Sequence, residues 1–329
     1  MSMKKYSALA KVTALATVAA LALAGCASTP AAETSAAGDH SDLKICVYTH
    51  GDGGTFWTVA QKGAEAAAAD LGVTLDYQGS TNDAAKQAST IEAGVAAGCS
   101  GIAASAPDPE AIKSAMLAAS DAGIPTVTMN SGSAVFKDLG AFTHVGQDEV
   151  VAGREAGLKF NALGVKHVLC PIQEAGNVGL EDRCKGLAET FTGKAENFNL
   201  DGGLADLTAA SAKLQAALEA DKTIDAVFAL NADIAAKAAL PAAEAAGLSL
   251  KIGTVDMSPE ALDAIEAGKM EFAIDQQQYA QGYMSVVLLY LNLTNSHELG
   301  GGLPIYTGPG FVTADNVAKV KELVAAGTR

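Results

Sequence analysis

The chain has 329 residues, 49% of them hydrophobic, and carries 22 Lys and Arg against 37 Asp and Glu, a formal net charge of −15. This length exceeds the usual single-domain size and favours two lobes, each with its own core. The acidic balance argues against a nucleic-acid partner, which needs a basic surface, and an anionic ligand would meet an unfavourable long-range field.

The first 25 residues have the plan of a secretory signal. Lys4, Lys5 and Lys11 supply its positive charge, no acidic residue precedes position 26, and the apolar stretch over 12–25 spans 14 residues. A bilayer takes about 20 helical residues to cross, so this stretch is too short to span one. We expect removal of residues 1–25, which takes away three of the 22 positive charges and leaves 19 against 37, a net charge of −18.

The residues around the expected cleavage point resemble the bacterial lipobox. The run Leu23-Ala24-Gly25-Cys26 would make Cys26 the lipidated first residue of the mature protein, the alternative being a chance cysteine behind a soluble-type signal. Residues 26–41 are small or polar and have no apolar periodicity, which predicts a flexible tether. These features predict an exported protein, lipid-anchored at the outer face of the cytoplasmic membrane or in the periplasm.

After the tether, short β-type runs alternate with Ala-rich helical stretches. The first series predicts strands over 43–49, 73–79, 101–106 and 125–130, with helices over 56–71, 83–97 and 109–122. The second predicts strands over 167–173, 226–231, 250–256 and 271–276, with helices over 148–163, 179–193, 206–220, 233–246 and 258–267. Repeated βα units indicate the α/β class, with two parallel sheets each flanked by helices.

Polar residues follow most of the predicted strands. His50 and Asp52 come after the first, Asn130 after the fourth, and Asn231 and Asp256 end two strands of the second series. In open parallel sheets, ligands bind beyond the carboxyl ends of the strands. These residues are therefore candidates for a ligand site.

Four cysteines remain beyond Cys26, and in an exported protein they allow two disulfides in three pairings. Cys170 ends a predicted strand and Cys184 opens the next helix, which favours a bridge between them. Cys46 and Cys99 would then pair by elimination, or remain as small buried hydrophobic residues. Clustered Cys and His spacing is absent, so the sequence predicts neither a metal site nor a cofactor.

Other motifs are weaker. Gly51–Gly54 lacks the spacing of a nucleotide-binding loop, and 197–202 opens like a calcium loop but has Thr208 at its twelfth position, so we expect a surface turn there. A glycosidase would need two carboxylates facing one bond. Asp256 is the one credible carboxylate in the cleft, with Asp52 a remote second, so we expect a protein that is not an enzyme.

From about Asp42 onward the chain resembles the type I periplasmic-binding-protein family, in its ribose-like, sugar-binding branch. The resemblance is carried by Phe56-Trp57 before a helix, Gly123-Ile124-Pro125 before a strand, AVFALN ending in Asn231, GTVD ending in Asp256, and FAIDQQQ containing Gln276.

The resemblance implies two Rossmann-like lobes joined by a three-segment hinge, over 42–146 plus 277–307 and over 147–276 plus 308–329. It implies a monomer that closes on its solute. The ligand-binding residues it implies are Phe56 and Trp57 as aromatic plates, Arg183 as a donor, and Asn231, Asp256 and Gln276 as polar ligands, with His50, Asp52 and Asn130 beside them. Asn130 and Ser131 depart from the charged pair of ribose binders, and the third aromatic, near Ala205, is missing.

Each assignment has a structural alternative. Phe56 or Trp57 could fasten the first helix to the sheet, and Gln276 could be a structural hinge residue. Arg183 could pair with a neighbouring acid, Glu181 or Asp182. Asn231 and Asp256 could be helix N-caps.

The implied function is capture of a small neutral sugar or sugar alcohol for an ABC importer, with a membrane permease and its ATPase as partners. The alternative is a receptor that reports the ligand to a sensor kinase or chemoreceptor. Because Asn130-Ser131 replaces the charged clamp that grips a sugar ring, we expect an acyclic polyol of four to six carbons rather than a cyclic pentose. The chain is also similar to xylitol- and threitol-binding members of the family.

Overall fold

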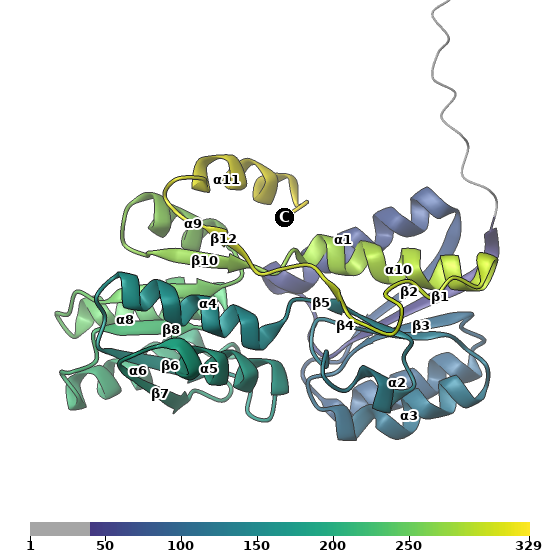
Figure 1. Ribbon diagram of the computed structural model, residues 1–329, viewed down its shortest axis with the longest axis horizontal. Helices are drawn as coiled ribbons and strands as arrows, with labels where there is room; N and C mark the ends of the chain where they lie inside the picture. Colours follow the sequence, from purple (N-terminus) through teal and green to yellow (C-terminus); the bar gives the residue numbers. More distant parts are fainter. Residues whose placement is uncertain (1–39) are drawn as a thin grey trace, which may run out of the picture. The chain divides into compact units, whose positions relative to one another are not determined.

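The computed structural model describes residues 40–329, and these contain two six-stranded sheets covered by helices (Figure 1). The expected signal peptide, the expected lipidation site Cys26 and most of the expected tether lie outside the described residues. Strand β1 begins at His40, which pairs with Val73, so the last two positions of the expected tether belong to the first sheet. None of the described helices combines the length and the apolar character that a membrane span requires.

The first sheet has the order β11-β5-β4-β3-β1-β2, and all of its pairs are parallel. Its strands are β1 (His40–Thr49), β2 (Val73–Gly79), β3 (Gly101–Ser105), β4 (Thr126–Met129), β5 (Thr143–Gly146) and β11 (Ile305–Tyr306). The associated helices are α1 (Gly54–Leu71), α2 (Ala84–Ala96), α3 (Pro109–Asp121), η1 (Phe136–Leu139) and α10 (Gln278–Asn295).

The second sheet has the order β12-β10-β9-β8-β6-β7, parallel except for the pair of β10 and β12. Its strands are β6 (His167–Ile172), β7 (Lys194–Asn199), β8 (Ala226–Ala229), β9 (Lys251–Val255), β10 (Phe272–Asp275) and β12 (Gly310–Val312). Its helices are α4 (Glu149–Ala162), α5 (Val178–Thr190), α6 (Leu207–Ala220), α7 (Ala232–Ile234), η2 (Ala235–Ala239), α8 (Leu240–Ala245), α9 (Pro259–Glu266) and α11 (Val317–Ala326).

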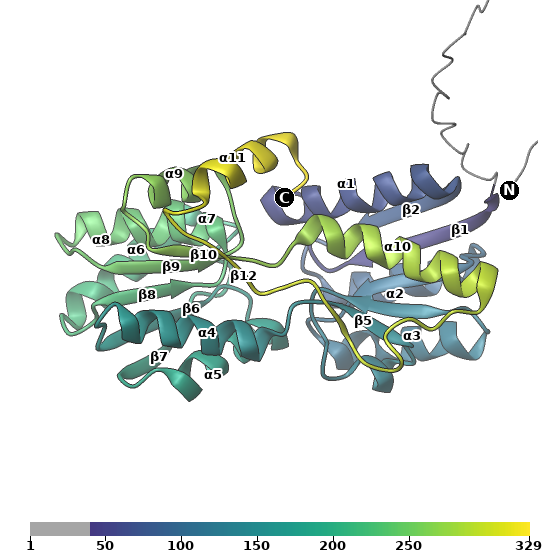
Figure 2. The same cartoon turned by 45° about the horizontal axis from the view of Figure 1, so that its top comes forward.

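Strand β1 explains why both faces of the first sheet are covered. Ile45 and Val47 pack with α1 and α10 on one face, while Cys46 and Tyr48 pack with α2 and α3 on the other. Alternate residues of a strand point to opposite faces, so a run that is apolar at every position needs a cover on both sides. Figure 2 shows α1 and α10 side by side over one face and α2 and α3 beyond the other.

Helices α1 and α10 approach closely because glycines lie at their contact. A side chain at Gly63 would collide with the carbonyl of Tyr279, and one at Gly282 with that of Ala60. Small residues therefore allow two helices from opposite ends of the chain to pack against each other.

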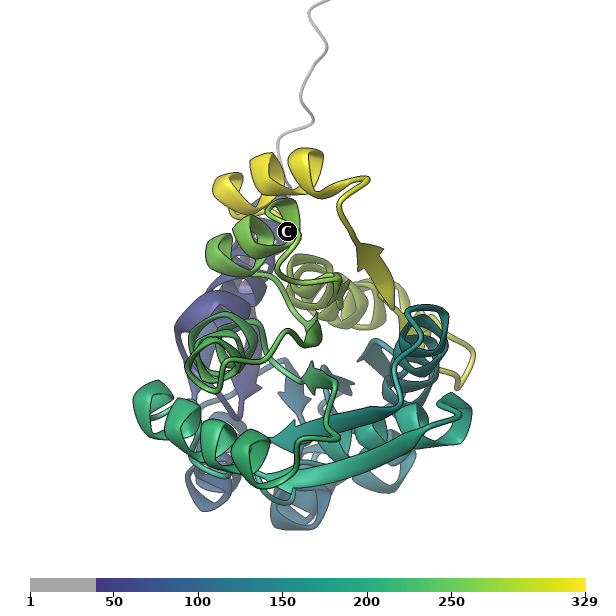
Figure 3. The same cartoon turned by 90° about the vertical axis from the view of Figure 1, so that its left-hand side faces the viewer.

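The chain passes from one sheet to the other three times, after β5, after β10 and after β11. The last segment, yellow in Figure 3, runs from β12 into α11 beside α9. Because the chain crosses in this way, residues near positions 50, 130, 180 and 276 come together in space, as described below.

The expected α/β architecture with helix-flanked sheets is confirmed, with differences in detail. The second sheet is not wholly parallel, because β12 runs against β10. Of the surface turn expected over 197–202, residues 197–199 belong to strand β7, and the turn follows over 201–205. The helix expected over 233–246 is interrupted by the π-helix η2, at a point where Pro241 has no backbone N–H to continue a regular α-helical ladder.

Both disulfides are present in the structure. Cys170 pairs with Cys184, as favoured from the sequence, and Cys46 pairs with Cys99. The first joins the end of β6 to α5, which carries Arg183. The second joins β1 to the segment that precedes β3.

Candidate functional site

A cavity of about 290 Å³ is lined by loops that follow strands of both sheets. Its size is at the lower end for small-molecule sites. The nine residues predicted as ligand-binding all lie on its wall: His50, Asp52, Phe56, Trp57, Asn130, Arg183, Asn231, Asp256 and Gln276. Their contact with a ligand stays a prediction.

The aromatic part of the wall comes from the start of α1. Trp57 makes edge contacts with both His50 and Phe56, each with ring centroids 4.8 Å apart. Gly51 leaves room for the indole, since a side chain there would overlap the Trp57 ring. Phe56 is buried in the core against the first sheet, so the expectation that one of the pair fastens the helix holds for Phe56, while Trp57 is half-buried.

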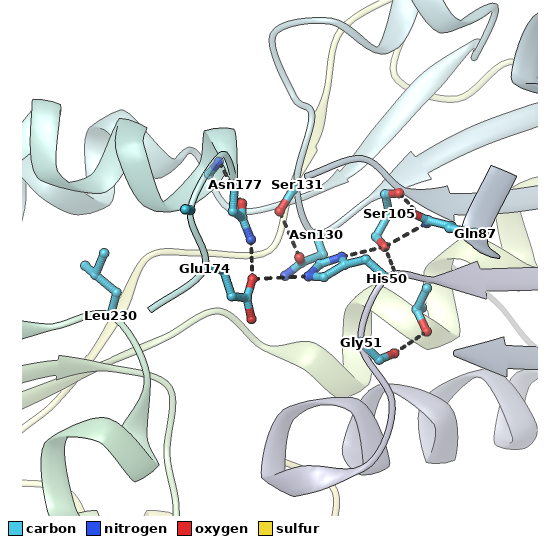
Figure 4. Close-up of polar contacts among 12 residues, drawn as sticks. His50, Gly51, Gln87, Ser105, Asn130, Ser131, Glu174, Asn177 and Leu230 are labelled. Carbon is cyan, nitrogen blue, oxygen red and sulfur yellow. Dashed lines mark hydrogen bonds and ion pairs between the residues drawn. The ribbon is translucent and has the colours of Figure 1, made fainter. Parts of the chain in front are cut away.

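His50 lies at the end of β1 and faces the second sheet. Its Nδ1 is 2.8 Å from Ser105 Oγ, which accepts from the His50 backbone N–H at 2.8 Å and from Gln87 Nε2 at 3.4 Å, so both lone pairs of the hydroxyl are used and its proton is left for Nδ1. The remaining ring proton is then on Nε2, 3.8 Å from Glu174 Oε2. Figure 4 shows His50 between Ser105 and Glu174. Burial lowers the pKa of His50.

Glu174 is held by α5 as well. Asn177 is the N-cap of this helix, accepting from Gly179 N, and its amide donates to Glu174 Oε2 at 2.6 Å (Figure 4). Next to it, Val178 N donates to Pro107 O at 3.1 Å, a backbone bond between the two lobes. The two lobes are therefore in direct contact at this side of the cavity.

A chain of amides and a carboxylate crosses the cavity. Ser131 Oγ donates to Asn130 Oδ1 at 3.0 Å, the Asn130 amide lies 3.5 Å from Gln276 Oε1, and Gln276 Nε2 donates to Asp256 Oδ1 at 2.6 Å. Asp256 does not cap a helix, because the N-cap of α9 is Ser258. Burial raises the pKa of Asp256 to about 7, although Arg183 and the bond from Gln276 oppose the shift.

Asn231 is the N-cap of α7, which is the structural role considered for it from the sequence. Its side-chain oxygen accepts from Asp233 N at 2.8 Å and from Ile234 N at 3.4 Å. Capping uses the oxygen alone, so it is compatible with a contact between the amide nitrogen and a ligand.

Arg183 pairs with neither of its sequence neighbours. Its guanidinium makes a two-point pair with Glu149, through Nε to Oε2 at 2.6 Å and Nη2 to Oε1 at 3.0 Å, and Nη1 donates to Leu230 O at 3.1 Å. Both side chains are 4% exposed. The alternative pairing of Arg183 with Glu181 or Asp182 is wrong, because helix packing brings α4 against α5 and places Glu149 next to the guanidinium.

The carboxylate count expected from the sequence is also wrong. Glu174 and Asp233 line the cavity together with Asp52 and Asp256. Glu174 belongs to the polar cluster Gln173-Glu174 after β6, a place at which the sequence favours a ligand site, but it was not among the predicted ligand-binding residues. Asp233 is paired with Lys237 at 3.0 Å.

A protein-family model described as "Periplasmic binding protein domain" matches residues 45–296. The chain belongs to this family. Family membership makes it an extracytoplasmic binding protein and not an enzyme, in agreement with the expectation from the sequence.

Known structures and curated proteins agree with this assignment. A carbohydrate transporter from Acidothermus cellulolyticus 11B, crystallised in complex with myo-inositol, is 42% identical, with a TM-score of 0.84 over 87% of this chain and 99% of that one. The xylose/arabinose-binding protein of Sulfolobus acidocaldarius is 24% identical over 85% of this chain and 73% of its own length. The ribose import binding protein of Haemophilus influenzae is 27% identical over 78% and 87%.

Proposed function

We propose that this protein captures a small, neutral, polyhydroxylated ring, of the class of myo-inositol, and delivers it to an ABC importer. The observation that carries the proposal is the myo-inositol complex of the 42% identical relative, which spans nearly all of the described residues. It favours a cyclic polyol over the acyclic one expected from the loss of the charged clamp at Asn130 and Ser131.

The cavity wall supports this class of ligand. The C–H face of a ring packs on an aromatic plate such as Trp57, and hydroxyl groups around the ring can both donate and accept. The wall offers acceptors at Asp256 and Glu174, amides at Asn130 and Gln276, and donors at Arg183.

The charges favour a neutral solute over an anionic one. Arg183 is the one Lys or Arg among the described residues of the cavity wall, and Glu149 already neutralises it. An anionic sugar acid would bring a further negative charge next to Asp52, Glu174 and Asp256, in a low-dielectric site where repulsion is strong.

A thermal-shift and calorimetry series tests the ligand class. The series contains myo-inositol, C4 to C6 alditols, cyclic pentoses and a hexuronate. We expect myo-inositol to stabilise the protein most, since a ligand at about 100 times its dissociation constant adds about 2.7 kcal/mol. Tight binding of an alditol or a pentose with no heat from myo-inositol would contradict the ring assignment.

We further propose that Cys26 is lipidated and that transport depends on the anchor while binding does not. Full-length Cys26→Ala protein should leave the membrane fraction and lose uptake of labelled solute, yet bind the solute with unchanged affinity. Retention of the variant in the membrane fraction would contradict a lipid anchor at this residue.

A further inference from the structure

Arg183 has few hydrogen-bond donors left for a ligand. A guanidinium carries five N–H protons, of which Nε and one on Nη2 go to Glu149 and one on Nη1 goes to Leu230 O. One proton on each Nη remains. The direction of these two protons is fixed by the three bonds already made.

Glu149 lies behind the cavity rather than on its wall. It is the first residue of α4, its side chain is 4% exposed, and Gln147 Nε2 donates to its Oε2 at 2.7 Å. Among the described residues its single ion-pair partner is Arg183. Its hydrogen bonds therefore reach the cavity through the guanidinium, while its charge also helps to raise the pKa of Asp256.

Gln147 connects the Arg183–Glu149 pair to the segments in which the chain crosses between the two sheets. It lies between β5 and α4, on the first crossing, and a side chain at Gly308, on the third crossing, would come within 3.3 Å of its Cβ. Gln147 Oε1 is buried and has no hydrogen-bond partner among the described residues. Contacts thus run from the crossings through Gln147 and Glu149 to Arg183.

Two other carboxylates attract the same guanidinium from the cavity side. Asp256 and Glu174 both act electrostatically on Arg183. Without Glu149 these two carboxylates are the remaining charges that attract the guanidinium, and a turn toward Asp256 would occupy a ligand acceptor and withdraw the donors of the arginine. A buried ion pair adds little net stability compared with apolar packing, so stability alone does not account for this one.

We infer that Glu149 is a positioning residue, which holds the Arg183 guanidinium away from Asp256 and aims its two unused protons at the ligand. This inference rests on the proposed function, in which Arg183 contacts a neutral polyol in the cavity.

The test is calorimetry with myo-inositol on Glu149→Gln, with Glu189→Gln as the matched control. Glu189 pairs with Arg154 between the same two helices, but this pair is exposed and off the cavity. We expect Glu149→Gln to lose about tenfold or more in affinity, which corresponds to about 1.4 kcal/mol. The control should bind like the wild type.

A double-mutant cycle separates positioning from a general structural role. In an Arg183→Met background, Glu149→Gln should change affinity by less than about twofold, because its effect passes through the arginine. An equal loss in both backgrounds would overturn the inference. Glu149→Asp keeps the charge and covers the case in which Glu149→Gln fails to fold, and it should lose affinity only in the presence of Arg183.

The crystal structure of ligand-free Glu149→Gln gives a readout that does not depend on the ligand. A guanidinium turned toward Asp256 supports the inference, and an unmoved one overturns it. If the wild-type protein binds none of the polyols, the proposed function fails while this structure still decides the role of Glu149.

Discussion

Asn130 and Asp256 share a backbone conformation that few side chains tolerate. Their φ angles are 63° and 69°, and each follows a strand, β4 or β9, at a corresponding place in its sheet. Asn and Asp are the non-glycine residues best suited to this left-handed region. Each N–H still bonds to the neighbouring strand, at Val145 O and Ile274 O. The conformation therefore ends the strand without an unpaired amide and directs the side chain to the cavity wall.

The raised pKa of Asp256 predicts a pH-dependent stability. An unfolded Asp titrates near 3.8 and the folded one at about 7, so between these values the folded protein holds a proton that the unfolded chain has lost. Stability from this group is complete below the lower value and is lost as pH rises through the upper one. As pH rises from about 4 to about 8, the wild type should lose this stability and Asp256→Asn should not, so the variant gains stability relative to the wild type. Urea unfolding at both pH values measures it.

Wild-type protein unfolded at the same two pH values supplies the reference for this experiment, because the difference between the two proteins removes the pH dependence of every other group. An Asp256→Asn difference that does not change with pH would show that the buried carboxyl is ionised throughout.

Trp57 should contribute directly to ligand binding. Trp57→Ala removes the plate against which a ring packs, and the loss of a central aromatic contact typically costs roughly 1–3 kcal/mol in affinity. Titration calorimetry measures this cost. Tyr306→Ala removes an aromatic residue that is 53% exposed and off the cavity, and it should bind normally. Equal affinities of Trp57→Ala and wild type would remove the indole from the site.

At the residue scale, the sequence predicted side chains that follow strands and missed Glu149, which opens helix α4. Asn130 and Asp256 were recognisable because a polar residue directly after an apolar strand has a defined place at the sheet edge. Glu149 had no comparable signal. Its partner Arg183 is 34 residues away, and only the packing of α4 on α5 brings the two together.

At the element scale, apolar periodicity predicted most of the long helices and central strands, but it missed helices α10 and α11 and strand β5, which lies inside the first sheet. The edge strands β7, β11 and β12 were also missed, for a physical reason. Strand β7 has no buried position, and its two apolar residues, Ala195 and Phe198, do not alternate, while β11 and β12 have two and three residues, too few to show a period. Their pairing is determined by the strands beside them rather than by their own sequences.

Each disulfide should stabilise the folded protein, and the one that closes the longer loop should stabilise it more. In the chain-entropy model the 14-residue separation of Cys170 and Cys184 is worth about 3 kcal/mol, and the 53-residue separation of Cys46 and Cys99 about 4 kcal/mol. Urea unfolding of the two double Cys→Ala variants should show a larger loss of stability without the Cys46–Cys99 bridge than without the Cys170–Cys184 bridge. Mass spectrometry of the non-reduced protein that found four free thiols would exclude both bridges.

At the scale of the whole molecule, we expect the lobes to open without ligand and close around it. The bond from Val178 N to Pro107 O and the approach of His50 to Glu174 join residues of the two lobes. Closure must desolvate these groups, and a ligand that contacts both lobes offsets that cost. Small-angle scattering should give a smaller radius of gyration at saturating solute. Identical radii with and without solute would argue against a hinge.

The late position of α10 and β11 in the sequence affects how the protein can be made. Val286, Leu288 and Leu289 of α10 cover one face of the first sheet, and β11 completes its edge only at residues 305–306. A growing chain that has reached residue 270 therefore leaves part of that face uncovered, because α1 is present there without α10, although all strands from β1 to β5 have been synthesised. The first lobe can complete its core only when nearly the whole chain is available.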